Sequence, residues 1–202
     1  MSVKRRKLQR PLGERRYRKL FVISVEGVKT EPQYFEIFNK NDQNIIKVNC
    51  LKSNHQSSPL QVLKRMETYL KTEELKQTDE AWLVIDMDQW SAEQIGQLFA
   101  WSKRKENYGL ALSNPMFEFW LLLHFEDGNK IGNANECLER LKRYLPGYKK
   151  GIDFRKFTHE TIHSAIRRAK QRDNPKCIDW PKTIGGTTVY RLVEKLFPST
   201  TP

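Results

Sequence analysis

Three carboxylates in this sequence are spaced in a way that suits the binding of a divalent cation. Asp86 and Asp88 are separated by one residue and follow the apolar run Trp82-Leu-Val-Ile85. If this run is a buried strand, side chains two residues apart point the same way, so the two carboxylates converge. Glu26 follows a second run of the same kind, Leu20-Phe-Val-Ile-Ser-Val25. A few carboxylate oxygens, completed by water and phosphate, are the ligands that Mg²⁺ prefers.

This set of carboxylates predicts chemistry on a phosphodiester. A bound Mg²⁺ or Mn²⁺ ion can polarise the phosphodiester, lower the pKa of an attacking water and stabilise the leaving oxygen. If the two strands are parallel neighbours, Glu26, Asp86 and Asp88 meet at the sheet edge where open α/β sheets bind ligands. We assign Asp86 and Asp88 mainly to metal coordination, and Glu26 to coordination or to general-base action on water. A strand-end turn with solvated aspartates is the alternative for the Asp86–Asp88 pair.

Two further glutamates, Glu31 and Glu118, are supporting candidates for the same site. Capping of a helix by Thr30, with Glu31 compensating the helix dipole, is the alternative explanation for the first. Glu118 lies in the aromatic segment Phe117-Glu-Phe-Trp120, where a carboxylate is costly without a partner. It would complete the metal site or hold a nearby cation, although a structural role in a helix capped by Asn114 is also open.

The chain carries an excess of positive charge, which favours a polyanionic partner. Its 202 residues have a formal net charge of +12, much of it in a basic arm over residues 1–18. A solvated surface would explain any single basic cluster. Together with the strand-end carboxylates, the clusters favour a nucleic acid, RNA or DNA, as the partner. The candidate substrate-binding residues are Lys29, Lys149, Lys150, Arg167, Arg168 and Lys170.

Several other classes of protein are disfavoured. No apolar run reaches the length of a membrane span, and the start of the chain lacks the apolar core of a signal peptide, so we expect a cytoplasmic protein. The 3 cysteines are widely spaced, which argues against a disulfide framework and a zinc site. The sequence has no GxxxxGK[ST] loop, so any use of ATP would require a separate ATPase subunit.

The elements that would position the carboxylates alternate along the first part of the chain. Helix-length segments separate the predicted strands, which indicates parallel βαβ units. One helix has a clear start, with Ser58 as its cap and Pro59 at its first position. Beyond Asp127 the pattern predicts helices only, the last over residues 187–196 with a threonine cap. The strands are predicted over residues 19–26, 45–51, 81–86 and 109–112.

These patterns together predict an α/β fold with a mostly parallel four-stranded sheet flanked by helices. The core would extend over residues 19–126 and follow the basic arm. Residues 127–202 would form a helical C-terminal part packed on that core.

Several segments resemble known proteins. Val25-Glu-Gly27 and Asp86-Met-Asp88 resemble the glutamate and DxD motifs of Toprim domains, the magnesium-binding fold of topoisomerases, primases and OLD-type nucleases. More specifically, residues 26–35, 113–125 and 187–196 look like the RloB-like family, which is found in bacterial and archaeal defence and restriction loci. The resemblance covers nearly the whole chain after the basic arm.

The resemblance implies a Toprim-like fold and a nuclease of antiviral defence that depends on Mg²⁺ or Mn²⁺. An alternative is a non-catalytic subunit of a defence complex that binds nucleic acid or a nucleotide. That subunit would bind in a salt-sensitive manner without turnover.

Overall fold

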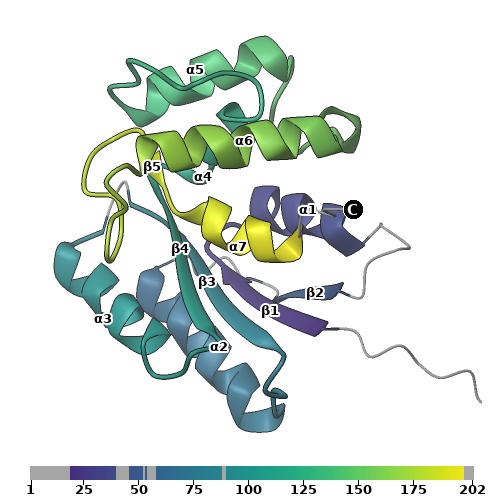
Figure 1. Cartoon of the computed structure of the whole chain (residues 1–202), viewed down its shortest axis with the longest axis vertical. Helices are drawn as coiled ribbons and strands as arrows, with labels where there is room; N and C mark the ends of the chain where they lie inside the picture. The colour runs from purple at the N-terminus through teal and green to yellow at the C-terminus, as the bar shows by residue number, and fades with distance from the viewer. Residues whose placement is uncertain (1–18, 40–45, 52, 54–57, 88–89, 198–202) are drawn as a thin grey trace, which may run out of the picture.

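A five-stranded sheet organises the chain, with the strand order β2-β1-β3-β4-β5. The structure is a computed structural model that describes residues 19–39, 46–51, 53, 58–87 and 90–197 (Figure 1). The basic arm over residues 1–18 and the carboxylate of Asp88 lie outside the described residues. The strands are β1 (Lys19–Val25), β2 (Ile46–Leu51), β3 (Glu80–Asp86), β4 (Tyr108–Asn114) and β5 (Gly186–Thr187).

Seven α-helices and two short 3-10 turns accompany the sheet in the described part of the chain. Two of the helices begin with the serine caps that their sequences encode. Ser58 accepts from the backbone N–H of Gln61 at the start of α2, and Ser91 forms a capping box with Gln94 at the start of α3. The helices are α1 (Thr30–Glu36), α2 (Pro59–Thr72), α3 (Ala92–Ser102), α4 (Phe117–Leu122), α5 (Ala134–Tyr144), α6 (His159–Arg172) and α7 (Val189–Leu196), with 3-10 turns at η1 (Ile37–Asn39) and η2 (Phe154–Lys156).

The predicted α/β class and the mostly parallel sheet are confirmed. β1 pairs in parallel with both β2 and β3, and β3 pairs in parallel with β4. The prediction of four strands and of helices only beyond Asp127 was incomplete, because β5 adds a fifth, antiparallel strand beside β4. With only 2 residues, β5 is too short for an alternating pattern, and its pairing with β4 defines it.

Helices cover both faces of the sheet, as the alternation of side chains requires. Phe21, Ile23 and Val25 of β1 enter the larger apolar core on one face, whereas Val22 enters a second core on the other. α2 and α3 lie on the face of the second core, and α1, α4 and α7 on the opposite face (Figure 1). α5 packs on α4, and α6 packs on α4 and α7.

The C-terminal part of the chain returns to the sheet and shares its larger core. Leu141 of α5, Ala165 of α6 and Leu192 of α7 are fully buried in the same cluster as Ile23 of β1. Thr188 at the cap position of α7 makes no side-chain capping bond, but the hydroxyl of the preceding Thr187 accepts from the backbone N–H of Val189, the first residue of the helix, at 3.2 Å. The hydroxyl of Thr188 instead accepts from the backbone N–H of Leu112 at 3.0 Å, which ties α7 to β4.

No helix in the described ranges is both long enough and apolar enough to cross a membrane.

His124 is a buried histidine whose ring is satisfied on both sides. Its Nδ1 lies 3.1 and 3.2 Å from the carbonyl oxygens of Trp120 and Leu121. Carbonyl oxygens only accept, so Nδ1 carries the hydrogen, and Nε2 accepts from the Tyr34 hydroxyl at 3.1 Å. Burial, with a smaller contribution from Arg168, lowers the pKa of His124 to about 3. The ring is therefore neutral at physiological pH.

This neutral histidine should make the fold less stable as the pH falls from 7 to 5. In the unfolded chain His124 takes up a proton near pH 6.5, whereas the folded chain resists protonation until its pKa of about 3. The unfolded state therefore binds more protons than the folded state in this window. The contribution of His124 to the free energy of unfolding falls by about 2 kcal/mol between pH 7 and pH 5. Urea denaturation at both pH values measures the loss. His124→Gln should show a pH dependence smaller by that amount, and an unchanged pH dependence would argue against the buried neutral ring.

Candidate functional site

An acidic pocket lies at the carboxyl ends of β1 and β3. These strands are parallel neighbours, in the register that pairs Val25 with Val84. Glu26 directly follows β1 and donates its backbone N–H to the carbonyl of Val84 at 3.2 Å. Asp86 is the last residue of β3. The expectation that the two strands end side by side is therefore confirmed for Glu26 and Asp86.

The carboxylate of Glu26 is held in place from two directions. Its Oε2 accepts from the backbone N–H of Asp86 at 3.2 Å. The indole Nε1 of Trp90 lies 3.3 Å from Oε1 and 3.4 Å from Oε2. Trp90 was not among the predicted site residues, although its position just after the Asp86-Met-Asp88 motif was a usable signal. Both contacts orient the Glu26 carboxylate toward the end of β3.

The pocket has a volume of about 270 Å³ and brings together four carboxylates and two lysines. It contains four of the five predicted site carboxylates, and the fifth, Asp88, lies outside the described residues. Its lining residues are Glu26, Gly27, Val28, Lys29, Thr30, Glu31, Asp86, Glu118 and Lys150.

Glu31 is a buried acid that folds back on the turn after β1. The residue is only 5 % exposed, and its Oε1 accepts from the backbone N–H of Gly27 at 2.9 Å. Burial raises the pKa of Glu31, with a further rise from Glu118, although backbone hydrogen bonds and Lys150 oppose it. A Cβ at Gly27 would lie 2.2 Å from Oε2 of Glu31, so a larger residue there requires the Glu31 carboxylate to move.

Gly27→Ala should therefore destabilise the protein by about 1–3 kcal/mol, the usual cost of inserting a methyl group into a packed site. The added Cβ would displace the Glu31 carboxylate and break its bond to the Gly27 N–H. Chemical denaturation measures the change. Gly96→Ala in α3 is the matched control, because its Cβ would meet nothing closer than 4.0 Å. The control should be stabilising by about 0.5–1 kcal/mol, and equal effects in both variants would contradict the packing argument.

Glu118 is paired with a lysine from a distant part of the chain. The residue is 1 % exposed in the first turn of α4, and its Oε1 accepts from Lys150 Nζ at 2.6 Å. The same oxygen accepts from the Tyr148 hydroxyl at 2.8 Å. Burial opposes the charge on Lys150, but Glu118, Asp86 and Glu31 together raise its pKa. Of the roles considered for Glu118, the structure thus supports the one in which it holds a cation.

Thr30 and Tyr148 connect the first turn of α1 to the segment that carries Lys150. Thr30 does not cap α1, because Lys29 occupies the cap position and makes no side-chain capping bond. The Thr30 hydroxyl instead donates to the Lys150 carbonyl at 3.0 Å and lies 3.1 Å from the Tyr148 hydroxyl. These contacts hold Lys150 at a φ of 62°, a left-handed conformation that is costly for a lysine.

Asn114 does not cap α4 as the sequence suggested. It is the last residue of β4, and its side-chain amide donates to the carbonyl of Pro181 at 3.4 Å. α4 begins at Phe117, after Met116 at a cap position without a side-chain bond. Tyr148 was not among the predicted site residues. It lies in an irregular segment whose composition carries no signal for its contact with Glu118.

The six predicted substrate-binding residues divide into two groups. Lys29 and Lys150 line the acidic pocket, and the other four do not. Lys149 and Arg167 are exposed. Lys170 forms an ion pair with Glu194, and Arg168 bonds both to Asp127 Oδ1 at 2.8 Å and to the carbonyl of Leu123 at 2.8 Å.

The pocket offers oxygen ligands of the kind that Mg²⁺ and Mn²⁺ take. Among the described residues, no group of three or more His, Cys, Asp or Glu side chains could by itself hold a metal ion. Mg²⁺ usually binds through one or two carboxylates and keeps several waters or substrate phosphates. Glu26 and Asp86 supply that number of carboxylates from adjacent strand ends. The donor set therefore fits a partly hydrated ion rather than one enclosed by protein.

The fold and the pocket define an α/β protein with an acidic site at the carboxyl ends of two parallel neighbouring strands. The protein family described as RloB-like protein matches residues 21–196. The chain belongs to this RloB-like protein family, as its motifs predicted. No curated protein and no solved structure matches the chain.

Proposed function

We propose that this protein is a metal-dependent nuclease that hydrolyses phosphodiester bonds of RNA or DNA and acts in antiviral defence. The observation that carries the proposal is the position of Glu26 and Asp86 at the ends of adjacent parallel strands, in one pocket with Lys29 and Lys150. The role in defence rests on the likeness of the motifs to those of the RloB-like family. Mg²⁺ or Mn²⁺ is the proposed cofactor, and a separate ATPase subunit is a proposed partner.

Glu26 and Asp86 would hold the ion, with Asp88 as a third candidate ligand. The ion would supply Lewis-acid chemistry that activates a water molecule and stabilises the leaving oxygen. Trp90 and the backbone N–H of Asp86 keep the Glu26 carboxylate in position for this role. Glu31 secures the turn after Glu26 through its bond to Gly27.

Lys29 and Lys150 would orient the substrate. Both line the pocket, and a lysine ammonium is a natural partner of a phosphate oxygen. Glu118, itself held by the Tyr148 hydroxyl, fixes the end of the Lys150 side chain, and the charges of Asp86 and Glu31 also act on this lysine. Positive charge is needed here, because four carboxylates would otherwise repel a phosphodiester.

The test is a cleavage assay with labelled single-stranded and duplex RNA and DNA, in Mg²⁺, Mn²⁺ or EDTA. We expect cleavage of at least one substrate with either metal and none with EDTA. Salt-sensitive binding without cleavage under any metal would overturn the nuclease and favour the non-catalytic binding subunit.

A further inference from the structure

Two adjoining cavities form one groove around the C-terminal end of α6, away from the acidic pocket. The first, about 600 Å³, is lined by the end of α6, the loop over residues 173–185 and β5. The second, about 780 Å³, lies between α6 and α7. Gln171, Asp173 and Asn174 line both cavities, so the two lie next to each other. We call the combined cavity the α6 groove.

The α6 groove is strongly basic. Its lining contains seven Lys or Arg and three Asp or Glu, a net charge of +4. The chain has a net charge of +12, of which the arm over residues 1–18 carries +7, so the remainder carries +5. The net charge of this one groove is therefore close to that of the whole chain outside the arm. The basic lining residues are Arg168, Lys170, Arg172, Lys176, Lys182, Arg191 and Lys195.

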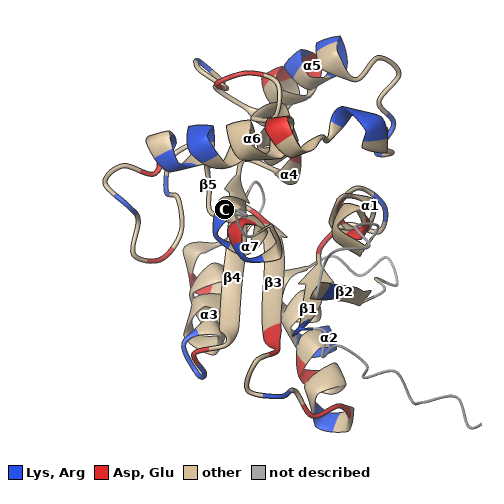
Figure 2. Cartoon of the chain, turned by 45° about the vertical axis from the view of Figure 1, so that its right-hand side comes forward, with Lys and Arg blue, Asp and Glu red and all other residues tan. Residues whose placement is uncertain are grey.

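Some of these cations are available to a phosphate. Lys182 pairs with Asp179 and Lys195 with Glu80, but both lysine side chains are roughly half exposed. Partly exposed pairs such as Lys182–Asp179 contribute only about 0–1 kcal/mol, so a phosphate can compete for Lys182. The Glu80 side chain is only 7 % exposed, so Lys195 stays paired with it. Lys176 is exposed and forms no ion pair with a described residue. Figure 2 shows Lys and Arg along the half of α6 from which the loop to β5 departs.

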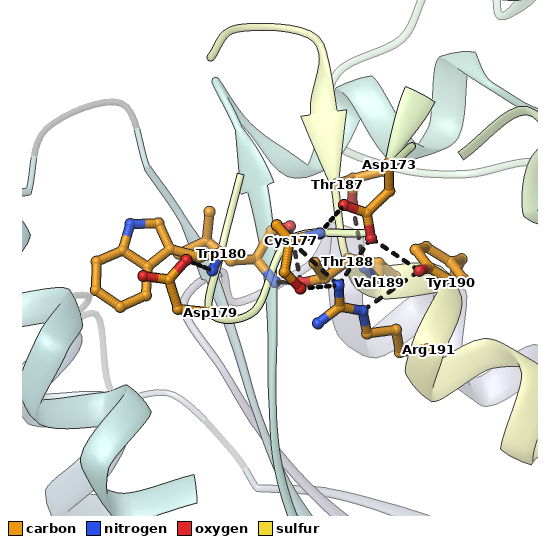
Figure 3. A network of polar contacts seen from close by, with 10 residues as sticks. Asp173, Cys177, Asp179, Trp180, Thr187, Thr188, Val189, Tyr190 and Arg191 are labelled. Carbon is orange, nitrogen blue, oxygen red and sulfur yellow. Dashed lines mark hydrogen bonds and ion pairs between the residues drawn. The ribbon is translucent and has the colours of Figure 1, made fainter. Parts of the chain in front are cut away.

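The loop that presents Lys176 and Lys182 is fastened at its start. Asp173 accepts from the Tyr190 hydroxyl at 2.8 Å, from Arg191 Nη2 at 2.7 Å and from the Cys177 N–H at 2.8 Å (Figure 3). Arg191 Nη2 also donates to the Cys177 carbonyl at 2.8 Å. Near its other end, Arg172 donates to the carbonyl of Gly185. The backbone of a loop held in this way needs little ordering on binding, which lowers the entropic cost of association.

The first cavity of the α6 groove lies at the same edge of the sheet as the acidic pocket, whereas Lys195 in the second cavity pairs with Glu80 at the start of β3. Asp86 of β3 pairs with Ser113 of β4, and Ser113 pairs with Thr187 of β5, which lines the groove. Two strand spacings separate Asp86 from Thr187, or about 10 Å between backbones. A polymer seated over the strand ends could therefore reach both places.

We propose that the α6 groove binds the sugar-phosphate backbone of the nucleic-acid substrate beside the acidic pocket. The inference rests on the proposed nuclease function and assigns Lys176 and Lys182 to substrate binding. Ile178, 87 % exposed on the same loop, would suit a protein partner instead. The net charge of the groove favours nucleic acid, because phosphate neutralisation by Lys and Arg dominates such binding.

Charge reversal in the groove tests the proposal. Lys176→Glu/Lys182→Glu is compared with Lys64→Glu/Lys71→Glu, an identical charge change at exposed positions of α2, on the opposite face of the sheet. Fluorescence anisotropy of labelled single-stranded and duplex DNA and RNA gives Kd for the full chain in EDTA, so that binding is recorded whether or not cleavage occurs.

We expect the groove variant to raise Kd by about tenfold or more, and the control by about twofold or less. The slope of log Kd against log salt concentration should become smaller in the groove variant, by up to about 2. Each duplex phosphate that the protein no longer neutralises lowers this slope by about 0.9. Lys176→Gln/Lys182→Gln should give an intermediate loss, and matching circular dichroism and unfolding midpoints establish that the variants fold. The DNA and RNA arms identify which polymer the groove holds.

Equal losses of nucleic-acid affinity in the groove and control variants, or an unchanged Kd in the groove variant, would overturn the proposal. A protein partner would then be the better explanation of this surface. Absence of binding by the wild-type chain would overturn it as well. Failure of the nuclease is a separate result: it appears as intact substrate in Mg²⁺ and Mn²⁺, whatever the groove variants do to Kd.

Discussion

Glu26→Gln and Asp86→Asn are each expected to reduce metal-dependent cleavage by more than about 100-fold. Residues that only orient metal ligands typically contribute about 10–100-fold, and direct ligands contribute more. Glutamine at position 26 keeps the size of the side chain and an oxygen that can accept from the Asp86 N–H, so the change removes charge rather than packing. Initial cleavage rates at saturating Mn²⁺ measure the effect.

Glu93→Gln is the matched control for this experiment. Glu93 is an exposed acid in the first turn of α3, a helix on the other face of the sheet. The control should cleave at close to the wild-type rate, with all three variants folded by circular dichroism. Wild-type rates in both Glu26→Gln and Asp86→Asn would place the chemistry elsewhere.

Lys150→Met is expected to destabilise the protein by about 2–4 kcal/mol. Glu118 is 1 % exposed, and its Oε1 accepts from both Lys150 and the Tyr148 hydroxyl. The variant would remove the lysine and leave a buried carboxylate oxygen with the Tyr148 hydroxyl as its donor. Removing one partner of a buried ion pair typically costs about 3–5 kcal/mol, and the partial exposure of Lys150 lowers this figure. Chemical denaturation at neutral pH measures the loss.

Lys149→Met provides the control, because Lys149 is an exposed neighbour that does not line the pocket. It should change stability by less than about 0.5 kcal/mol. Combining Lys150→Met with Glu118→Gln should recover part of the loss, because the double variant no longer buries an uncompensated charge. If Lys150→Met costs no more than Lys149→Met, the Glu118–Lys150 pair does not stabilise the fold.

The positions of Glu26 and Asp86 could be predicted because each follows a continuous apolar run. A parallel sheet buries its strands on both faces, so these runs were visible in the sequence, and helix-length connections implied parallel neighbours. The register of β1 and β3 then places both residues at one edge. The core of the candidate site thus depends on local patterns that a sequence carries.

The remainder of the site depends on contacts between distant segments, which no periodicity encodes. Lys150 reaches Glu118 from an irregular segment, so only the three-dimensional structure shows that Glu118 holds this cation. Thr30 and Asn114 looked like helix caps, yet tertiary hydrogen bonds to Lys150 and Pro181 engage their side chains. β5 was missed for the same reason, because pairing with β4 alone makes those 2 residues a strand.

The central claim, that the acidic pocket binds a divalent cation, is tested most directly by a crystal structure of the protein with Mn²⁺. We predict an anomalous-scattering peak between the carboxylates of Glu26 and Asp86, and its loss in Glu26→Gln crystals treated in the same way. A pocket without a peak at saturating Mn²⁺, or Mn²⁺ bound only elsewhere on the protein, would contradict the account.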